Sequence, residues 1–261
     1  MNKLCQILTA TTLATALVIP VAMGDHHEGD LIEMALSNPD RPEADKTRDA
    51  DRKPGDVLAF FAMEPGMMVL ETFAGGGYYT ELLSRIVGPE GKVFSHNNQA
   101  SLAFLGDELT IRFADNRLPN AEPFLAEAND IAMAENSIDL ALNILNYHDI
   151  YWVPSEESGY VWPTIDAQTF LGRLYSALKP GGILGIIDHS AVAGSSSDSG
   201  TTVHRIDEQI VIQQVLASGF ELVESAGFLR NPDDDRSLNV FDSAIRGKTD
   251  RFVLKFRKPL S

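Results

Sequence analysis

Cysteine is almost absent from this chain of 261 residues, in which Cys5 stands alone. A single cysteine cannot form an internal disulfide, so the stability of the protein has to come from burial of an apolar core. With 44% hydrophobic and 22% charged residues, the composition is that of an ordinary globular protein. The length allows one large domain.

Basic residues are also scarce. Lysine and arginine number 21 against 37 aspartates and glutamates, which gives a net charge of −16. A protein of this charge repels phosphate backbones and anionic lipid headgroups. The balance therefore predicts neither nucleic acid nor a membrane surface as a partner. It leaves the oligomeric state open.

Only one long run lacks charge, and it lies at the N-terminus. Lys3 precedes the apolar residues 4–19, and Pro20 with the small residues around 22–24 follows them. This order is typical of a secretory signal peptide. We therefore expect residues 1–24 to be removed and the mature protein to be periplasmic or secreted, without membrane association after cleavage. An uncleaved anchor is the alternative, although the run is short for a bilayer span.

Two further parts follow the predicted signal peptide. Residues 25–53 are rich in charged residues and proline and predict a solvated polar lead-in with one helical segment. In residues 54–261, apolar runs alternate with amphipathic stretches. Strands are predicted at 68–73, 92–97, 121–127, 138–145, 183–188, 221–225 and 251–257, and helices at 78–87, 101–117, 166–178 and 207–218. This alternation predicts a Rossmann-like α/β domain, a mostly parallel sheet with helices on both faces.

The segment after the first predicted strand is rich in glycine. Such sheets bind ligands at the carboxyl ends of their strands, where the strand order reverses. Glycines at 75–77 let the backbone approach a ligand closely, and the N–H groups of the following helix point the same way. A plain tight turn would show the same pattern.

Three ordered segments carry a resemblance to a known family. Residues 69–80 are similar to the first motif of class I S-adenosylmethionine (SAM) methyltransferases, in which a glycine turn follows an acidic strand end. Residues 129–140 resemble the segment that leads into the fourth strand, and residues 178–184 resemble the motif before the fifth. The segments 147–149, 188–190 and 204–207 resemble a group of exported predicted methyltransferases.

The resemblance implies SAM as the cofactor and assigns residues to it. Glu71 and the turn would hold its methionine portion, and Asp130 would contact the adenine amino group. Phe73 stands where the family has its first glycine, and Asn97 replaces the acid that accepts the ribose hydroxyls. The implied cofactor-binding residues are Glu71, Ala74, Gly75, Gly76, Gly77, Asn97 and Asp130.

Three histidines, His96, His148 and His189, end strands at this same edge of the predicted sheet. With neighbouring carboxylates they could form an acid/base site, because imidazole titrates near neutrality and a carboxylate can orient it. The predicted catalytic residues are His148 as general base with Asp149 and His189, and Asp188 and His204 could take part. Structural roles for each histidine remain open.

Aromatic residues cluster after the fourth predicted strand, at Tyr147, Tyr151, Trp152, Tyr160 and Trp162. They would either line a pocket for a planar or apolar acceptor or pack among themselves on the surface. The Gly/Ser-rich residues 194–200 predict a flexible segment, either a lid or a connector.

Three functional hypotheses follow from these patterns. The first is a SAM-dependent methyltransferase acting on a small molecule. The second is an exported, non-catalytic ligand-binding protein on the same fold. The third is a metal-assisted enzyme in which His148, His189 and Asp188 bind a transition-metal ion.

Overall fold

A computed structural model describes residues 28–260. The predicted signal peptide and the first residues of the predicted lead-in lie outside this range. Across the described residues, the structure contains no helix with both the length and the apolar character needed to cross a bilayer.

The centre of the structure is a seven-stranded sheet with the order β3-β2-β1-β4-β5-β7-β6. The first five strands run parallel, and β7 lies antiparallel between β5 and β6. The strands are β1 (Met68–Thr72), β2 (Lys92–Asn97), β3 (Ala121–Leu125), β4 (Ile138–Ile144), β5 (Leu178–His189), β6 (Glu221–Ala226) and β7 (Arg251–Arg257). This architecture confirms the predicted Rossmann-like, mostly parallel sheet.

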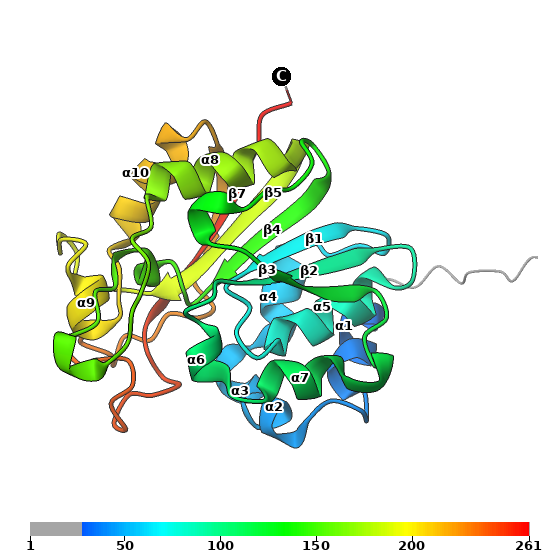
Figure 1. Ribbon diagram of the computed structural model, residues 1–261, viewed down its shortest axis with the longest axis horizontal. Coiled ribbons are helices and arrows are strands. Elements are labelled where there is room, and N and C mark those ends of the chain that lie inside the picture. The colour runs from blue at the N-terminus through cyan, green and yellow to red at the C-terminus, as the bar shows by residue number, and fades with distance from the viewer. Residues whose placement is uncertain (1–27, 261) are drawn as a thin grey trace, which may run out of the picture.

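Helices cover both faces of the sheet (Figure 1). They are α1 (Glu28–Ser37), α2 (Glu43–Thr47), α3 (Asp49–Arg52), α4 (Pro54–Phe60), α5 (Tyr78–Val87), α6 (Leu102–Leu105), α7 (Glu108–Phe113), α8 (Ala167–Ala177), α9 (Ser199–Val203) and α10 (Glu208–Ala217). Apolar side chains of α8 and α10 pack on one face, and those of α1, α4 and α5 pack on the other. The sheet is therefore buried on both sides, which explains the near-continuous apolar run of β4.

The helix predicted at 101–117 is interrupted. Gly106 has φ 50° and ψ −126°, a conformation that L side chains rarely adopt, and the chain forms the separate helices α6 and α7 around it. The helical pattern of residues is present, but one glycine conformation breaks it.

The segment predicted as a solvated lead-in forms three helices over its described part. Ile32 and Ala35 of α1 are buried in the core beneath the sheet. In α2, the buried Asp45 lies 2.7 Å from the guanidinium of Arg112 in α7. Apolar contacts and a buried ion pair thus join this segment to the domain. Its polar composition had predicted that the segment would be solvated.

A network of ion pairs around Glu81 fixes the helices on this face. The Glu81 carboxylate in α5 is fully buried and accepts hydrogen bonds from three arginine side chains, those of Arg85, Arg112 and Arg117. Arg117 also donates to the carbonyl of Asp40, in the loop between α1 and α2. One carboxylate therefore ties α5 and α7 to the N-terminal helices.

We predict that Glu81→Gln lowers the free energy of unfolding by about 3–5 kcal/mol, because buried guanidinium groups lose their countercharge. Urea unfolding followed by circular dichroism measures the change. Glu122→Gln is the matched control, since Glu122 pairs with Lys92 at the surface and its loss should cost less than about 1 kcal/mol. Equal effects of the two substitutions would show that the network does not stabilise the fold.

Candidate functional site

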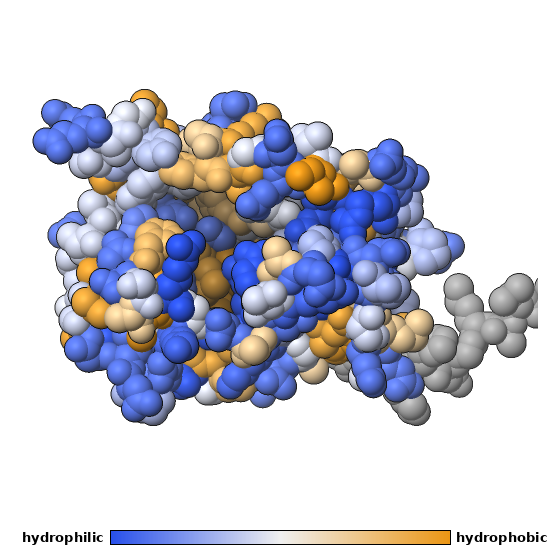
Figure 2. Space-filling view, turned by 90° about the horizontal axis from the view of Figure 1, so that it is seen from below, coloured by the Kyte–Doolittle hydropathy of each residue, from blue (hydrophilic) through white to orange (hydrophobic). Residues whose placement is uncertain are grey.

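A pocket of about 520 Å³ opens at the carboxyl edge of the sheet, where β1 and β4 lie side by side. The ends of four strands reach it through Thr72, Asn97, Ile144 and His189. Figure 2 shows a hollow on this side of the molecule, apolar inside and surrounded by hydrophilic surface. This is the place where a sheet with reversed strand order binds ligands.

The glycine turn forms one wall of the pocket. Ala74, Gly75 and Gly76 line it, and Gly77 begins α5 behind them. Gly75 and Gly77 have φ angles of 59° and 81°, in the region that favours glycine. The prediction of a turn that brings backbone to a ligand site agrees with this geometry.

Phe73 has an unusual conformation for its residue type. Its φ is 52°, in the region that favours glycine. Its N–H donates to Nδ1 of His96 at 3.2 Å, and its carbonyl accepts from Asn146 at 3.1 Å. The ring packs against His96 and Phe170. The side chain therefore forms an apolar floor of the pocket, while two hydrogen bonds hold its backbone.

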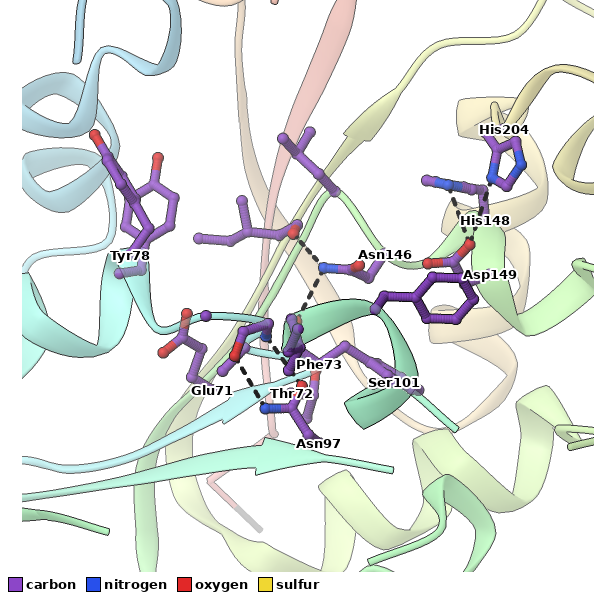
Figure 3. A pocket seen from close by; sticks show the side chains of 18 of the residues that line it. Glu71, Thr72, Phe73, Tyr78, Asn97, Ser101, Asn146, His148, Asp149 and His204 are labelled. Carbon is purple, nitrogen blue, oxygen red and sulfur yellow. Dashed lines mark hydrogen bonds and ion pairs between the residues drawn. The ribbon is translucent and has the colours of Figure 1, made fainter. Parts of the chain in front are cut away.

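Asn97 supports the same turn. Its Oδ1 accepts from the Gly75 N–H at 3.0 Å, and its Nδ2 donates to the Gly75 carbonyl at 3.1 Å (Figure 3). A carboxylate could accept the first bond but could not donate the second. Class I SAM methyltransferases, which this segment resembles, have an acid at this position. The amide here instead hydrogen-bonds both polar groups of the Gly75 backbone and retains one N–H for a ligand.

The structure places Asp130 outside the pocket, contrary to its predicted contact with adenine. Asp130 ends the short 3-10 helix Ala128–Asp130, and its side chain is exposed. The acid nearer the strand end is Glu127. Its Oε1 accepts from the backbone N–H of Gln99, and its Oε2 is buried without a hydrogen-bond partner among residues 28–260. The sequence alone cannot show which of these two acids has a buried oxygen, because that depends on the conformation of the turn after β3.

Two opposite charges lie in the pocket beside the turn. Glu71, at 3% exposure, accepts a hydrogen bond from Thr80, and burial raises its pKa to about 7. Arg52 of α3 extends over the ring of Tyr78 at 4.6 Å, and burial lowers its pKa. Neither forms an ion pair within the described part of the chain. Arg52 was missed from the sequence because it lies in the predicted lead-in.

His148 begins the 3-10 helix His148–Tyr151 after β4 and is surrounded by carboxylates. Its Nδ1 lies 2.8 Å from Oδ1 of Asp188, and its Nε2 lies 3.3 Å from Oδ1 of Asp149. Burial alone would lower the pKa of His148, but Asp188 and Asp149 together raise it to about 9. An imidazole of this pKa is protonated at neutral pH, so this arrangement does not support His148 as a ready general base.

The other two strand-end histidines are neutral. His189 lines the pocket, its Nδ1 lies 2.6 Å from the Thr249 hydroxyl, and burial places its pKa well below the usual value. His96 is fully buried between the N–H of Phe73 and the carbonyl of Ala126, and burial lowers its pKa to about 4. His96 therefore has a structural role, whereas His148 and His189 both lie in the pocket.

The residues predicted to bind metal do not form a common site. Asp188 accepts hydrogen bonds from the backbone N–H groups of His148 and His189 as well as from the His148 ring, so its oxygens are occupied. A different set is brought together. Donor atoms of His148, Asp149 and His204 all lie within 4.8 Å of one another.

Aromatic side chains line the pocket near these histidines, although only two of the five predicted ones take part. Trp152 and Trp162 line it, with ring centroids 5.2 Å apart. Tyr147 and Tyr151 instead bond to Gln214 of α10, on the core side. Phe104 and Phe241, from distant segments, complete the wall.

The Gly/Ser segment 194–200 is tied to its surroundings. The Gly194 N–H donates to Asp207, and Ser199 and Gly200 begin α9. At Gly200, a Cβ atom would lie 2.5 Å from the carbonyl oxygen of His148. The glycine therefore allows α9 to pack directly on the His148 helix, a contact that composition could not indicate.

Comparisons with known proteins agree with this fold. The family model described as protein-L-isoaspartate(D-aspartate) O-methyltransferase (PCMT) matches residues 39–115, less than half of the chain. Comparison with curated proteins finds no match.

Solved structures are similar over most of the chain. A SAM-dependent methyltransferase from Aquifex aeolicus has a TM-score of 0.56 and 20% identity, over 83% of this chain and 98% of that one. The phosphoethanolamine N-methyltransferase 2 of Haemonchus contortus, in complex with SAM, has a TM-score of 0.56 and 13% identity, over 88% and 60%. The [4+2]-cyclase SpnF has a TM-score of 0.52 and 17% identity, over 81% and 82%. At these identities, the likeness establishes the class I methyltransferase fold.

The raised pKa of Glu71 predicts a pH-dependent stability. Between the ordinary value of 4.5 and about 7, the native state holds a proton that the unfolded state has lost, so stability falls as the pH rises through this range. We expect Glu71→Gln to match the wild type near pH 4, below the ordinary pKa, and to exceed it at pH 8 by up to about 3 kcal/mol. Urea unfolding of the ligand-free proteins at both pH values measures this difference. Parallel curves for the two proteins would contradict it.

Proposed function

We propose that this protein is a SAM-dependent methyltransferase that acts on a small acceptor. The observation that carries the proposal is the pair of Glu71, which is buried, and Arg52, which is half-buried. These two opposite charges line one pocket and are not paired with each other. Buried charges require partners. A ligand with both an ammonium and a carboxylate group would supply them, and the methionine portion of SAM has both.

The residues around this pair fit the rest of such a ligand. Glu71 would accept from the ammonium group and Arg52 would bind the carboxylate, while the backbone of Ala74 and Gly75 leaves room for close approach. Asn97 lines the pocket and retains one amide N–H for a ligand. When bound, SAM supplies an electrophilic methyl group on its sulfonium.

The acceptor would occupy the opposite end of the pocket. Figure 3 shows Glu71 and Tyr78 on one side, His148, Asp149 and His204 on the other, and Asn146 between them. Trp152, Trp162, Phe104 and Phe241 line the histidine end, which suits a planar or apolar molecule. A pocket of about 520 Å³ that also holds SAM leaves room for a small acceptor only.

The similarity to a structure solved with SAM and to the PCMT family supports the proposed cofactor. A [4+2]-cyclase has a similar fold, so the fold alone does not determine the reaction. Stoichiometric SAM binding without transfer to any acceptor would favour the ligand-binding protein over the methyltransferase.

Calorimetry tests the proposed cofactor site. We expect the purified protein to bind SAM and S-adenosylhomocysteine at one site per chain. Arg52→Ala should weaken binding about 10- to 100-fold, because a charge-assisted hydrogen bond to the carboxylate is lost. Arg246→Ala, at an exposed position, is the matched control and should bind as the wild type does.

The same experiment has a clear negative outcome. Absence of heat with both ligands at high micromolar concentration would reject the cofactor, and equal affinity of the two arginine variants would reject the role of Arg52. Transfer of the labelled methyl group of SAM to a panel of small phenols, thiols and amines then tests the acceptor class.

Export through the predicted signal peptide also remains part of the proposal, on the pattern of residues 1–24. We expect the mature protein in the periplasmic or secreted fraction to begin at Asp25, as N-terminal mass spectrometry would detect. Recovery of the full-length chain from the cytoplasm would contradict export.

A further inference from the structure

We propose that His148, Asp149 and His204 form a binding site for a divalent transition-metal ion at the acceptor end of the pocket. Nε2 of His148 lies 3.3 Å and Nδ1 of His204 lies 3.7 Å from the same oxygen, Oδ1 of Asp149. In Figure 3 the three side chains converge on one point. All three line the pocket, so an ion bound there would face the ligand cavity.

The orientation of His148 is the one found in metal sites. Asp188 holds Nδ1 of the ring at 2.8 Å and the backbone N–H of the same residue at 2.7 Å. Nε2 is thereby directed toward Asp149, away from Asp188, and a bound ion would replace the proton that this nitrogen carries when His148 is protonated. A carboxylate behind a metal-binding histidine fixes the ring and increases its basicity, and this second partner is a regular feature of such sites.

His204 supplies the independent observation. Its Nδ1 is buried and has no hydrogen-bond partner among the residues that the structure describes. A buried polar nitrogen without a partner costs free energy, so its presence requires an explanation. The His204 ring contacts the rings of Trp152 and Phe241, at centroid-to-centroid distances of 5.5 and 4.9 Å. A metal ion beside Asp149 would satisfy this nitrogen.

The backbone places the two histidines rigidly. His204 follows α9 in a left-handed conformation, with φ 53°. Its helix is held on the His148 helix by the close contact of Gly200 and by the Thr201 hydroxyl, which donates to the Tyr151 carbonyl at 2.7 Å. The neighbouring Arg205 is fully buried and forms a bidentate pair with Asp234. The ligand set thus comes from two packed elements.

The donor atoms indicate the kind of ion. Two imidazole nitrogens and one carboxylate oxygen suit Zn²⁺ or a similar first-row ion and do not suit Mg²⁺, which prefers oxygen ligands. Three protein ligands would leave a coordination position of a tetrahedral ion open to the pocket that they line. An acceptor with a hydroxyl or thiol group could bind there, and coordination would lower the pKa of that group. This last step rests on the proposed methyltransferase function, whereas the metal site does not.

Titration of the metal-stripped full-length protein with Zn²⁺ tests the site, with Co²⁺ absorption as a spectroscopic probe of the ligands. We expect one ion per chain and no competition by millimolar Mg²⁺. His204→Ala and Asp149→Asn should each weaken Zn²⁺ binding more than about tenfold and abolish the visible Co²⁺ bands. Circular dichroism and thermal unfolding verify that the variants are folded.

Two matched controls distinguish this site from others. His189→Ala should bind Zn²⁺ as the wild type does, because His189 bonds to Thr249 and lies outside the ligand set. The chain also has two adjacent histidines near its N-terminus, His26 and His27, which are not among the proposed ligands. The double variant His26→Ala/His27→Ala should therefore also bind normally. Retained binding in His204→Ala, loss in either control or no stoichiometric binding in the wild type would overturn the proposal. Because SAM is titrated separately, failure of the metal site is distinguishable from failure of the cofactor site.

Discussion

The parallel pairing of β1 with β4 is the constraint on which the site depends. Val69 to Thr72 are in register with Leu140 to Asn143, and the Thr72 hydroxyl bonds to both the Leu142 carbonyl and the Asn143 side chain. The chain leaves β1 in one direction to build β2 and β3, then returns to β4 on the other side. The loops after β1 and β4 therefore diverge and leave the crevice that becomes the pocket.

Around this crevice the fold retains polar groups that cost stability. Glu71 is buried with a raised pKa, Arg52 is desolvated, and Nδ1 of His204 has no partner among residues 28–260. Two other buried charges in the described structure are paired within the chain, Glu81 with three arginines and Arg205 with Asp234. Glu71, Arg52 and His204 differ from these two in that they line the pocket, where a bound ligand would reach them.

The proposed cofactor end and the proposed metal end meet at Asn146. Its amide donates to the carbonyls of Phe73 and Ile144, so it joins the glycine turn to the segment that carries His148 and Asp149. This side chain thus links the two halves of the pocket in addition to the pairing of β1 with β4. This coupling gives a physical reason for a shared site in which one half binds the methyl donor and the other binds the acceptor.

Periodicity in the sequence by itself determined the fold class, most strands and the glycine turn, because burial on one or both faces imposes a local pattern. It also indicated that His148 and His189 lie at the ligand-binding edge. Only the tertiary structure decided which groups meet. Arg52 enters the pocket from a segment of polar composition, Glu127 rather than Asp130 has the buried carboxylate, and His204 approaches Asp149 through the packing of α9. These contacts join residues far apart in the chain or depend on the conformation of one turn. A local sequence pattern predicts neither.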